Sequence, residues 1–522
     1  MKILLVTGRL AEPIVRRYAS ESRLKAEVVA LPFAVAALMT SHYIASHLKS
    51  RDVTGFDLVM VPGLVKGDVS TISEEVGVPA FKGPRYAADL PSVLNLLSED
   101  KIKLSTTIPA CDLIREQLSR IALESIREAE ANREELLKRP GNMKIGNLAV
   151  GRDFPARVLA EIVDAPKMLD EEIRRRAIYY AESGADIIDI GMIAGLSQPK
   201  DAFRAVKIVK SAVDLPVSID SLDPAEIESA VSAGADLILS LDGGNLDAVA
   251  RFASHIPAVV IPTDFRRSLF PKEAAAKVQL LEQNFERARR AGFTKLIADP
   301  ILDPLIHPGS IESILAAERF RRLHPDELMM LGVGNAIELL DADTPGANAV
   351  FAGIAAELEV SILLTTEVSD KARGSVAELS KLSDMMFLAR RRNSAPKDLG
   401  LDLLILKEKR RKDELFNQNL LSEVSSVKAE EVGRSGSDPK GCFKILLDRG
   451  SSEIVLLHYT RPDLEKPDLV IRGDSAAAVY KTAVQKDLLS SLEHAAYLGA
   501  EVTKAEIALK LGRSYVQDSP VF

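Results

Sequence analysis

The stretch Gly184-Ala185-Asp186-Ile187-Ile188-Asp189-Ile190-Gly191 joins the end of a helix-like segment to a short apolar run. A second stretch of the same kind, Ser232-Ala233-Gly234-Ala235-Asp236-Leu237-Ile238, follows it further along the chain. In both, a Gly supplies the left-handed cap of a helix, and the apolar run is typical of a buried parallel strand. The two stretches therefore predict a repeated unit in which each helix leads directly into a strand.

The same alternation extends in both directions from these units. Helical segments separate eight apolar runs, which we expect to be the strands Val158–Val163, Asp186–Ile190, Val217–Asp220, Leu237–Leu241, Ala258–Ile261, Lys295–Ala298, Leu328–Leu331 and Ser361–Leu364. Eight strands and eight helices in a segment of this length are typical of a closed (β/α)₈ barrel. We therefore predict an α/β protein with a central TIM barrel at residues 147–392, and an open doubly wound sheet is the competing architecture.

The segment before the barrel, residues 1–145, also alternates strand and helix and predicts a Rossmann-like or flavodoxin-like α/β domain. Its expected strands are Ile3–Val6, Ala26–Ala30, Asp57–Val61 and Leu104–Ile108. A charged helix at about residues 112–138 follows them. The first turn, Thr7-Gly8-Arg9, lacks the GxGxxG pattern, so no NAD is expected. Gly-rich loops at residues 62–68 and 82–85 are open to a ligand or the next domain, although ordinary turns are the commoner reading.

After the barrel we expect a linker at residues 393–440 and a small α+β domain at residues 441–522. The linker contains a strand-like run, Leu401–Leu406, a charged run, Lys407–Glu414, and a polar loop, Glu423–Lys440. The final domain is expected to hold a hairpin, a third strand and two helices, at Phe443–Leu447, Ile454–His458, Asp468–Ile471, Ser475–Gly499 and Thr503–Leu511.

Composition narrows the classes of partner. Lys and Arg total 67 and Asp and Glu total 75, for a net charge of -8, so no nucleic-acid partner is expected. No stretch approaches the roughly 20 apolar residues of a membrane span. The start of the chain has no signal-peptide architecture, and Cys111 and Cys442 form no ligand or disulfide pattern. We therefore expect a cytoplasmic protein with no membrane contact.

In barrels of this kind, reacting groups sit at the carboxyl ends of the strands. Polar residues at these ends are Asp164, Asp189, Asp220, Ser240, Asp299 and Asn335. Carboxylates accept hydrogen bonds only, and they match the N–H edge of a reduced pterin: its 2-amino group, N3–H and N8–H. A phosphosugar site with Gly332-Val333-Gly334 as its anion-binding turn is the rival. Asp242 and Asn245 are expected to be loop or capping residues.

The barrel motifs, with Pro216-Val217-Ser218-Ile219-Asp220-Ser221 between the two stretches quoted first, resemble the pterin-binding barrel superfamily. This superfamily includes dihydropteroate synthase and methyltetrahydrofolate:corrinoid methyltransferase. The three-part layout resembles the archaeal dihydropteroate synthase-related proteins, which occur where tetrahydromethanopterin replaces folate. The resemblance implies that Asp220 and Asp299 bind the pterin, with Asp164 near the family's first-strand Asn. Gly332-Val333-Gly334-Asn335 resembles the methyltransferase motif whose Asn contacts the pterin near N5.

The departures from the family pattern concern the basic groups of the synthase. Gly334 and Asn335 occupy the stretch of its strand-seven Lys, and Thr365-Thr366-Glu367 replaces its Arg-x-His. The fourth-strand Asn falls on Leu239, next to Ser240. Lys371 and Arg373 are candidates to replace the lost cations at an anion site, although a surface basic pair explains them equally well.

Three functions stay open on this resemblance. The first is a dihydropteroate synthase-like enzyme of tetrahydromethanopterin or folate-type metabolism. The second is a one-carbon transferase that uses a methyl- or methylene-tetrahydropterin, and the third is a non-catalytic pterin carrier. No catalytic residue is assigned, and His307 is the only histidine expected near the barrel mouth. A Mg²⁺ ion held by Asp164, Asp189, Asp220 and Asp299 and a homodimer both stay open.

Overall fold

The computed structural model describes the chain apart from residues 392, 394, 398, 409–424, 426 and 430–437, and the side chains of residues 88, 115–122 and 125 are also left aside. The chain forms two compact units, Met1–Asn417 and Gln418–Phe522. Among the described residues, no helix is both long and apolar enough to cross a membrane.

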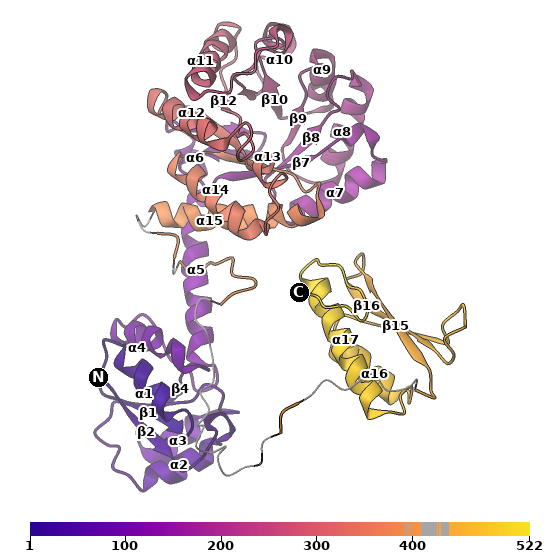
Figure 1. Cartoon of the computed structure of the whole chain (residues 1–522). Coiled ribbons are helices and arrows are strands. Elements are labelled where there is room, and N and C mark those ends of the chain that lie inside the picture. The colour runs from indigo at the N-terminus through magenta and orange to yellow at the C-terminus, as the bar shows by residue number, and fades with distance from the viewer. Residues whose placement is uncertain (392, 394, 398, 409–424, 426, 430–437) are drawn as a thin grey trace. The chain divides into compact units, whose positions relative to one another are not determined.

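The larger unit contains a closed barrel of eight parallel strands, with a ring of helices around them (Figure 1). The strands are β7 (Arg157–Ile162), β8 (Ile187–Gly191), β9 (Val217–Asp220), β10 (Leu237–Leu241), β11 (Ala258–Val260), β12 (Leu296–Ala298), β13 (Leu328–Gly332) and β14 (Ile362–Thr365). The last strand pairs with the first, with Ile362 opposite Arg157, so the sheet closes. The predicted barrel is confirmed, and an open sheet is excluded.

Nine α-helices follow or flank these strands. They are α7 (Asp170–Glu182), α8 (Pro199–Ala212), α9 (Pro224–Ala233), α10 (Leu246–Ala253), α11 (Ala274–Arg290), α12 (Ser310–Leu323), α13 (Val333–Ile337), α14 (Thr344–Glu357) and α15 (Ser375–Arg391). Asp223 caps α9 by accepting from the N–H groups of Ala225 and Glu226. Gly234 ends that helix at a φ of 107°, as the repeated sequence unit predicted.

Side-chain alternation along each strand divides the barrel core into two layers. Leu159, Ile187 and Leu237 belong to the inner layer, which fills the barrel. Their neighbours Val158 and Ile188 belong to the outer layer, which packs under the helices. Because side chains alternate with a period of two, this arrangement also fixes which polar residues point into the barrel.

A β-hairpin that was not predicted precedes the barrel. It consists of β5 (Asn142–Ile145) and β6 (Leu148–Gly151), which pair antiparallel. Ile145 and Val150 are fully buried and belong to the inner layer of the barrel core. Since the hairpin leads into β7, it covers the end of the barrel at which the strands begin.

The first part of the chain forms a parallel sheet with the strand order β2-β1-β3-β4. Its elements are β1 (Ile3–Gly8), α1 (Glu12–Ser20), β2 (Ala26–Leu31), α2 (Ser41–Lys49), β3 (Leu58–Val61), α3 (Ser70–Val76), β4 (Ala80–Lys82), α4 (Leu90–Ser98), α5 (Ala110–Ala131) and α6 (Arg133–Leu136). The predicted parallel α/β domain is confirmed, and its strand order is that of the flavodoxin-like alternative. Leu104–Ile108 is not a strand, because the Ser105 hydroxyl accepts from the N–H groups of Thr107 and Ile108 and turns the backbone.

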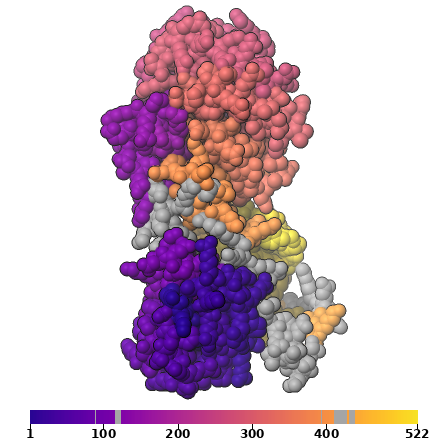
Figure 2. Space-filling view, turned by 90° about the vertical axis from the view of Figure 1, so that its left-hand side faces the viewer, coloured from indigo at the N-terminus to yellow at the C-terminus, as the bar shows by residue number. Residues whose placement is uncertain are grey.

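The end of α5 packs on the barrel: Ala129 shares a hydrophobic cluster with Phe154 and Phe387. On the face shown in Figure 2, the barrel residues form a continuous surface, coloured from magenta to orange. The barrel and the first domain have separate hydrophobic cores.

The smaller unit holds a three-stranded antiparallel sheet and two helices, as expected. Its elements are β15 (Cys442–Asp448), β16 (Glu453–Tyr459), β17 (Leu469–Gly473), α16 (Ala476–Gln485) and α17 (Leu492–Lys510). The helix break lies between Gln485 and Leu492 instead of near residue 501, with Asp487 at a φ of 57°. The run Leu401–Leu406 is not a strand, and most of Lys407–Glu414 and of the loop before Lys440 lies outside the described residues.

Candidate functional site

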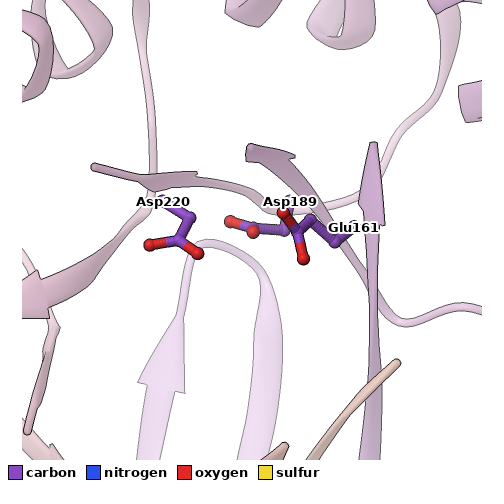
Figure 3. A group of neighbouring side chains, drawn as sticks. All are labelled: Glu161, Asp189 and Asp220. Atoms are coloured by element: carbon purple, nitrogen blue, oxygen red, sulfur yellow. The ribbon is translucent and has the colours of Figure 1, made fainter. Parts of the chain in front are cut away.

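Three carboxylates meet at the mouth of the barrel, on neighbouring strands (Figure 3). Glu161 lies on β7 opposite Asp189 of β8, and Asp220 ends β9. Period-two alternation turns all three side chains into the barrel. Leu159 and Ile187, two residues before Glu161 and Asp189, belong to the inner layer, and Ile219, next to Asp220, belongs to the outer layer. One oxygen from each carboxylate lies within 4.8 Å of the other two.

Asp189 is the most deeply buried member of this carboxylate cluster, with no exposed surface. The Ser218 hydroxyl donates to its Oδ1, and its Oδ2 has no hydrogen-bond partner among the described residues. Burial, followed by the charges of Asp220 and Glu161, raises the pKa of Asp189 well above its usual value. A buried oxygen without a partner is costly, so this atom fits a ligand that donates a hydrogen bond or carries positive charge.

The other two carboxylates are also easier to protonate than usual. Burial, with the charges of Asp220 and Asp164, raises the pKa of Glu161 to about 8. Burial raises the pKa of Asp220 to about 6. Carboxylates this close in a buried place do not all ionise together, so the cluster holds protons at neutral pH unless a ligand supplies compensating charge.

Asp299 stands directly after β12 (Leu296–Ala298) and is 7% exposed. Its Oδ1 accepts from the Ile301 N–H at 2.8 Å, and burial raises its pKa to about 7. The charge of Asp220 contributes to that rise, which relates Asp299 to the cluster. Beneath this loop, the buried Lys277 ammonium donates to the Ile301 carbonyl and to Asp303, which fixes the loop that carries Asp299.

The remaining predicted pterin residues lie around this centre with other partners. The Asp164 carboxylate pairs with Lys167 at 2.6 Å and is partly exposed, although its charge acts on Glu161. Ser240 is buried, and its carbonyl accepts from the Asn245 amide. Asn335 is exposed, and its amide donates to the Leu302 carbonyl at 3.3 Å. Ligand binding by these three residues stays a prediction.

The candidate anion site after β14 is occupied by internal contacts. Lys371 donates to the Leu340 carbonyl at 2.6 Å and pairs with Asp341 at 3.1 Å. Arg373 is exposed, and its charge acts on Tyr179. Glu367 accepts from the Tyr179 hydroxyl and from the Val376 N–H at the start of α15. In this arrangement Glu367 and Lys371 both have partners within the chain, and anion binding by Lys371 and Arg373 stays a prediction.

Two further predictions concern residues outside the cluster. Asp242 accepts from the N–H groups of Gly244, Asn245 and Phe265, and Asn245 accepts from the Asp242 N–H, so both hold loops as expected. His307 is exposed in a loop. Neither loop supplies a group that reaches the carboxylate cluster in the described hydrogen bonds.

Glu161 is the site residue that sequence reasoning missed. It lies inside the predicted first strand, where an acidic residue was taken as part of the apolar run. The alternation would have identified it, because an inward Leu159 requires an inward Glu161 two residues later. For a Mg²⁺ ion, the ligand set that the structure groups is Glu161, Asp189 and Asp220, instead of one containing Asp164 and Asp299. These hard oxygen ligands fit such an ion, which prefers oxygen and usually keeps several waters.

Three family models match the chain. Residues 166–324 match the family described as Pterin binding enzyme. Residues 1–85 match a family of unknown function, DUF6513, and residues 437–518 match PterinBD-DUF4346. The closed barrel, its acidic mouth and the first of these matches define the class: a pterin-binding-type (β/α)₈ barrel with additional domains at both ends.

The chain is also similar over its whole length to an archaeal protein. It is 39% identical to Uncharacterized protein MJ0107 of Methanocaldococcus jannaschii, over 100% of this chain and 99% of that protein. The chain belongs to the family of that archaeal protein, and its barrel matches the Pterin binding enzyme family.

Solved structures with a similar fold include bacterial dihydropteroate synthases. The Xanthomonas albilineans enzyme in complex with 7,8-dihydropteroate is 19% identical, with 49% of this chain and 100% of that chain covered and a TM-score of 0.38. The Yersinia pestis enzyme is 18% identical, with 48% and 100% covered and a TM-score of 0.38. At these identities and TM-scores, no function follows from the likeness alone.

Proposed function

We propose that this protein binds a reduced pterin in the barrel mouth and is a transferase of tetrahydromethanopterin or folate-type cofactor metabolism, related to dihydropteroate synthase. The observation that carries the proposal is the buried cluster of Glu161, Asp189 and Asp220, with an unpartnered Asp189 oxygen. Such a cluster has fewer hydrogen-bond donors than its carboxylate oxygens can accept, and a flat heterocycle with several N–H groups would supply them.

The physical basis is a match between acceptors and donors. The pterin edge offers the 2-amino group, N3–H and N8–H, and ionised carboxylates accept all three. Binding would therefore favour the ionised forms of Asp220 and Asp299, whose pKa values are about 6 and about 7. The protein would release protons as it binds pterin, and affinity would rise with pH across this range.

Within this function, one observation favours one-carbon transfer over the synthase reaction. The synthase reaction releases pyrophosphate, which needs cations at the mouth. Here Glu367 is fixed at the end of β14 and Lys371 is held by the Leu340 carbonyl and Asp341. The second candidate is therefore a transferase that uses a methyl- or methylene-tetrahydropterin, with exposed Asn335 near N5 and the carboxylates orienting the ring.

The test is a fluorescence titration of the whole protein with dihydro- and tetrahydropterins. Because the chain has no Trp, ligand fluorescence is little obscured. We expect micromolar binding, about −8 kcal/mol, and a loss of at least about 100-fold in Asp220→Asn and in Asp299→Asn. Asp341→Asn is the matched control, since Asp341 is fully exposed and pairs only with Lys371 in the described contacts.

The outcome of the titration then directs the assay of activity. Pyrophosphate release from a dihydropterin diphosphate with an arylamine would identify synthase chemistry. Loss of the methyl group from a methyl-tetrahydropterin to a corrinoid or thiol would identify the one-carbon reaction. Absence of pterin binding, or equal binding by Asp220→Asn and the wild type, would overturn the proposal.

A further inference from the structure

The first domain contains a second cavity, which the barrel proposal does not use. It has a volume of about 250 Å³ and lies at the carboxyl ends of β1 and β3. Its lining includes Thr7, Ile14, Tyr18, Ala37, Met60 and Tyr86. The sheet order β2-β1-β3-β4 places β1 and β3 side by side, and their connections lead to strands on opposite sides. Open parallel sheets bind ligands at such a switch point, outside the carboxyl ends of the strands.

Close backbone approach shapes the edge of this cavity. A Cβ atom on Gly63 would lie 2.5 Å from the Gly83 carbonyl oxygen, and one on Gly8 would lie 2.8 Å from the Ala36 nitrogen. Both positions therefore require Gly for steric reasons, with no need for a special φ. The loops that leave β1 and β3 are held tightly, so the cavity is a fixed feature of the fold.

The charges around the cavity disfavour an anionic ligand. Arg85 is its charged lining residue, and its guanidinium pairs with Asp112 at 2.6 Å. The first turn of α1 carries Glu12, whose carboxylate pairs with Arg16, and Pro13, which removes one N–H donor. A helix start of this composition does not suit a phosphate. The turn after β1, Thr7-Gly8-Arg9, agrees with this, because it lacks the dinucleotide-binding pattern.

The lining instead suits an uncharged ring. Its side chains are predominantly aliphatic, with Tyr18 and Tyr86 as aromatic surfaces and Thr7 as a polar group at the end of β1. Val35, Leu64 and Tyr86 at the cavity are 42%, 42% and 39% exposed, although burial of such groups is favourable. A volume of about 250 Å³ is slightly below the usual range for ligand pockets, which limits the ligand to one or two rings.

We propose that the first domain binds a small, flat, uncharged aromatic molecule in this cavity. The site is separate from the carboxylate cluster, and it stands whether or not the barrel binds a pterin. Burial of the ring supplies the affinity, and the Thr7 hydroxyl and backbone groups at the strand ends supply orientation.

The absence of Trp from the chain makes a direct test available. Tyr86→Trp in the full-length protein places a single indole at the cavity, and Phe56→Trp, before β3 at the amino edge of the sheet, is the control. The probes are 4-ethylaniline, uncharged at pH 8, and 4-ethylbenzoate, an anion of similar size. We expect 4-ethylaniline to change the Tyr86→Trp fluorescence with a Kd below about 1 mM. We expect 4-ethylbenzoate to bind at least about tenfold more weakly, a difference of about 1.4 kcal/mol.

Two filling variants make the result specific to the cavity. Ala37→Phe and Ala11→Leu, each combined with Tyr86→Trp, should abolish the response to 4-ethylaniline while circular dichroism remains that of the parent. Two separate positions guard against a variant that fails to fold. The proposal is overturned by a silent Tyr86→Trp reporter, by an equal response from Phe56→Trp, by equal binding of the two probes, or by unchanged binding in a folded filling variant.

Discussion

Two buried aspartates, one in each compact unit, have opposite electrostatic environments. The Asp438 side chain has no exposed surface and accepts hydrogen bonds from the Lys440 N–H, the Ser490 N–H and hydroxyl, the Ser491 N–H and His494. Burial opposes its ionisation, but the bonds from Ser490, Lys440 and His494 outweigh burial and hold the pKa of Asp438 well below its usual value.

Asp189 in the barrel is equally buried and accepts one side-chain bond, from Ser218. Its neighbours Glu161 and Asp220 are carboxylates, so its pKa moves the other way. The difference teaches that burial does not reveal the role of an acidic residue, whereas its partners do. Asp438 is satisfied by its own chain and joins the start of the smaller unit to α17, while Oδ2 of Asp189 has no hydrogen-bond partner among the described residues.

The largest expected effect is a loss of stability when Asp438, the aspartate with a full set of hydrogen bonds, is replaced. Asp438→Ala leaves several buried donors without an acceptor, so we expect a loss of about 3–5 kcal/mol in the unfolding free energy of the smaller unit. Because the folded pKa of Asp438 is depressed, its stabilisation is present above the usual carboxyl pKa and is lost as pH falls below about 4. Urea unfolding, followed with hydrogen exchange of the first α17 amides, measures both effects.

The control for that variant is Asp487→Asn, which removes the charge and tolerates the positive φ of this position. Asp487 is exposed and pairs with Lys440, which also contacts Asp438 through its N–H. A surface pair contributes little, so we expect a change below about 0.5 kcal/mol. An equally small change in Asp438→Ala would contradict the structural role given to Asp438.

A smaller effect of opposite sign is expected in the barrel. The raised pKa of Glu161 means that the folded state binds more protons than the unfolded state, so stability falls as pH rises toward about 8. Glu161→Gln removes one of the competing charges and should stabilise the barrel by about 1–3 kcal/mol at pH 8, with little change at pH 5. Thermal or urea unfolding at the two pH values measures the difference.

Glu338→Gln is the matched control in the same barrel. Glu338 accepts from the Thr366 hydroxyl and from the Val368 and Ser369 N–H groups. Burial raises the pKa of Glu338, but these hydrogen bonds outweigh burial, so its pKa is below the usual value. The variant should destabilise the protein, and more so at pH 8 than at pH 4. If both variants shift stability in the same direction at pH 8, the contrast between satisfied and unsatisfied carboxylates fails.

The smallest effect concerns the single bond to Asp189. The Ser218 hydroxyl lowers the pKa of Asp189, so Ser218→Ala should raise that pKa further and weaken pterin binding at pH 7 by about three- to tenfold. A pterin titration at pH 7 measures the affinity. Ser232→Ala, which removes an exposed hydroxyl bonded to the Ser229 carbonyl in α9, should leave it unchanged.

The barrel strands could be predicted to within about one or two residues because each is a short apolar run opened by a Gly, a Pro or a turn. The sequence was less informative where an element is short or held by side chains. The three-residue β4 (Ala80–Lys82) was missed, and Leu104–Ile108 was assigned in its place. The β5–β6 hairpin was missed because its two strands have four residues each, and it straddles residue 147, the predicted start of the barrel.

For the candidate site, the strand-end rule named Asp220, which lies in the carboxylate cluster, and it named Asp189 with no assignment of its orientation. It also named Asp299, whose ligand binding stays a prediction. It missed Glu161, which precedes the end of β7, and it could not foresee that Lys371 would be held by Leu340 and Asp341. Strand ends are local features of the sequence. The partner of a long flexible side chain depends on loops far away in the chain, so pattern reasoning does not reach it.

The hairpin beneath the barrel has a kinetic consequence. Ile145 and Val150 fill the end at which the strands begin, so molecules reach the carboxylates only from the opposite end. Under the proposed transferase function, two reactants would share this one route, and the one that contacts Glu161 and Asp189 would enter before its partner. The proposed function therefore predicts an ordered sequence of binding and release.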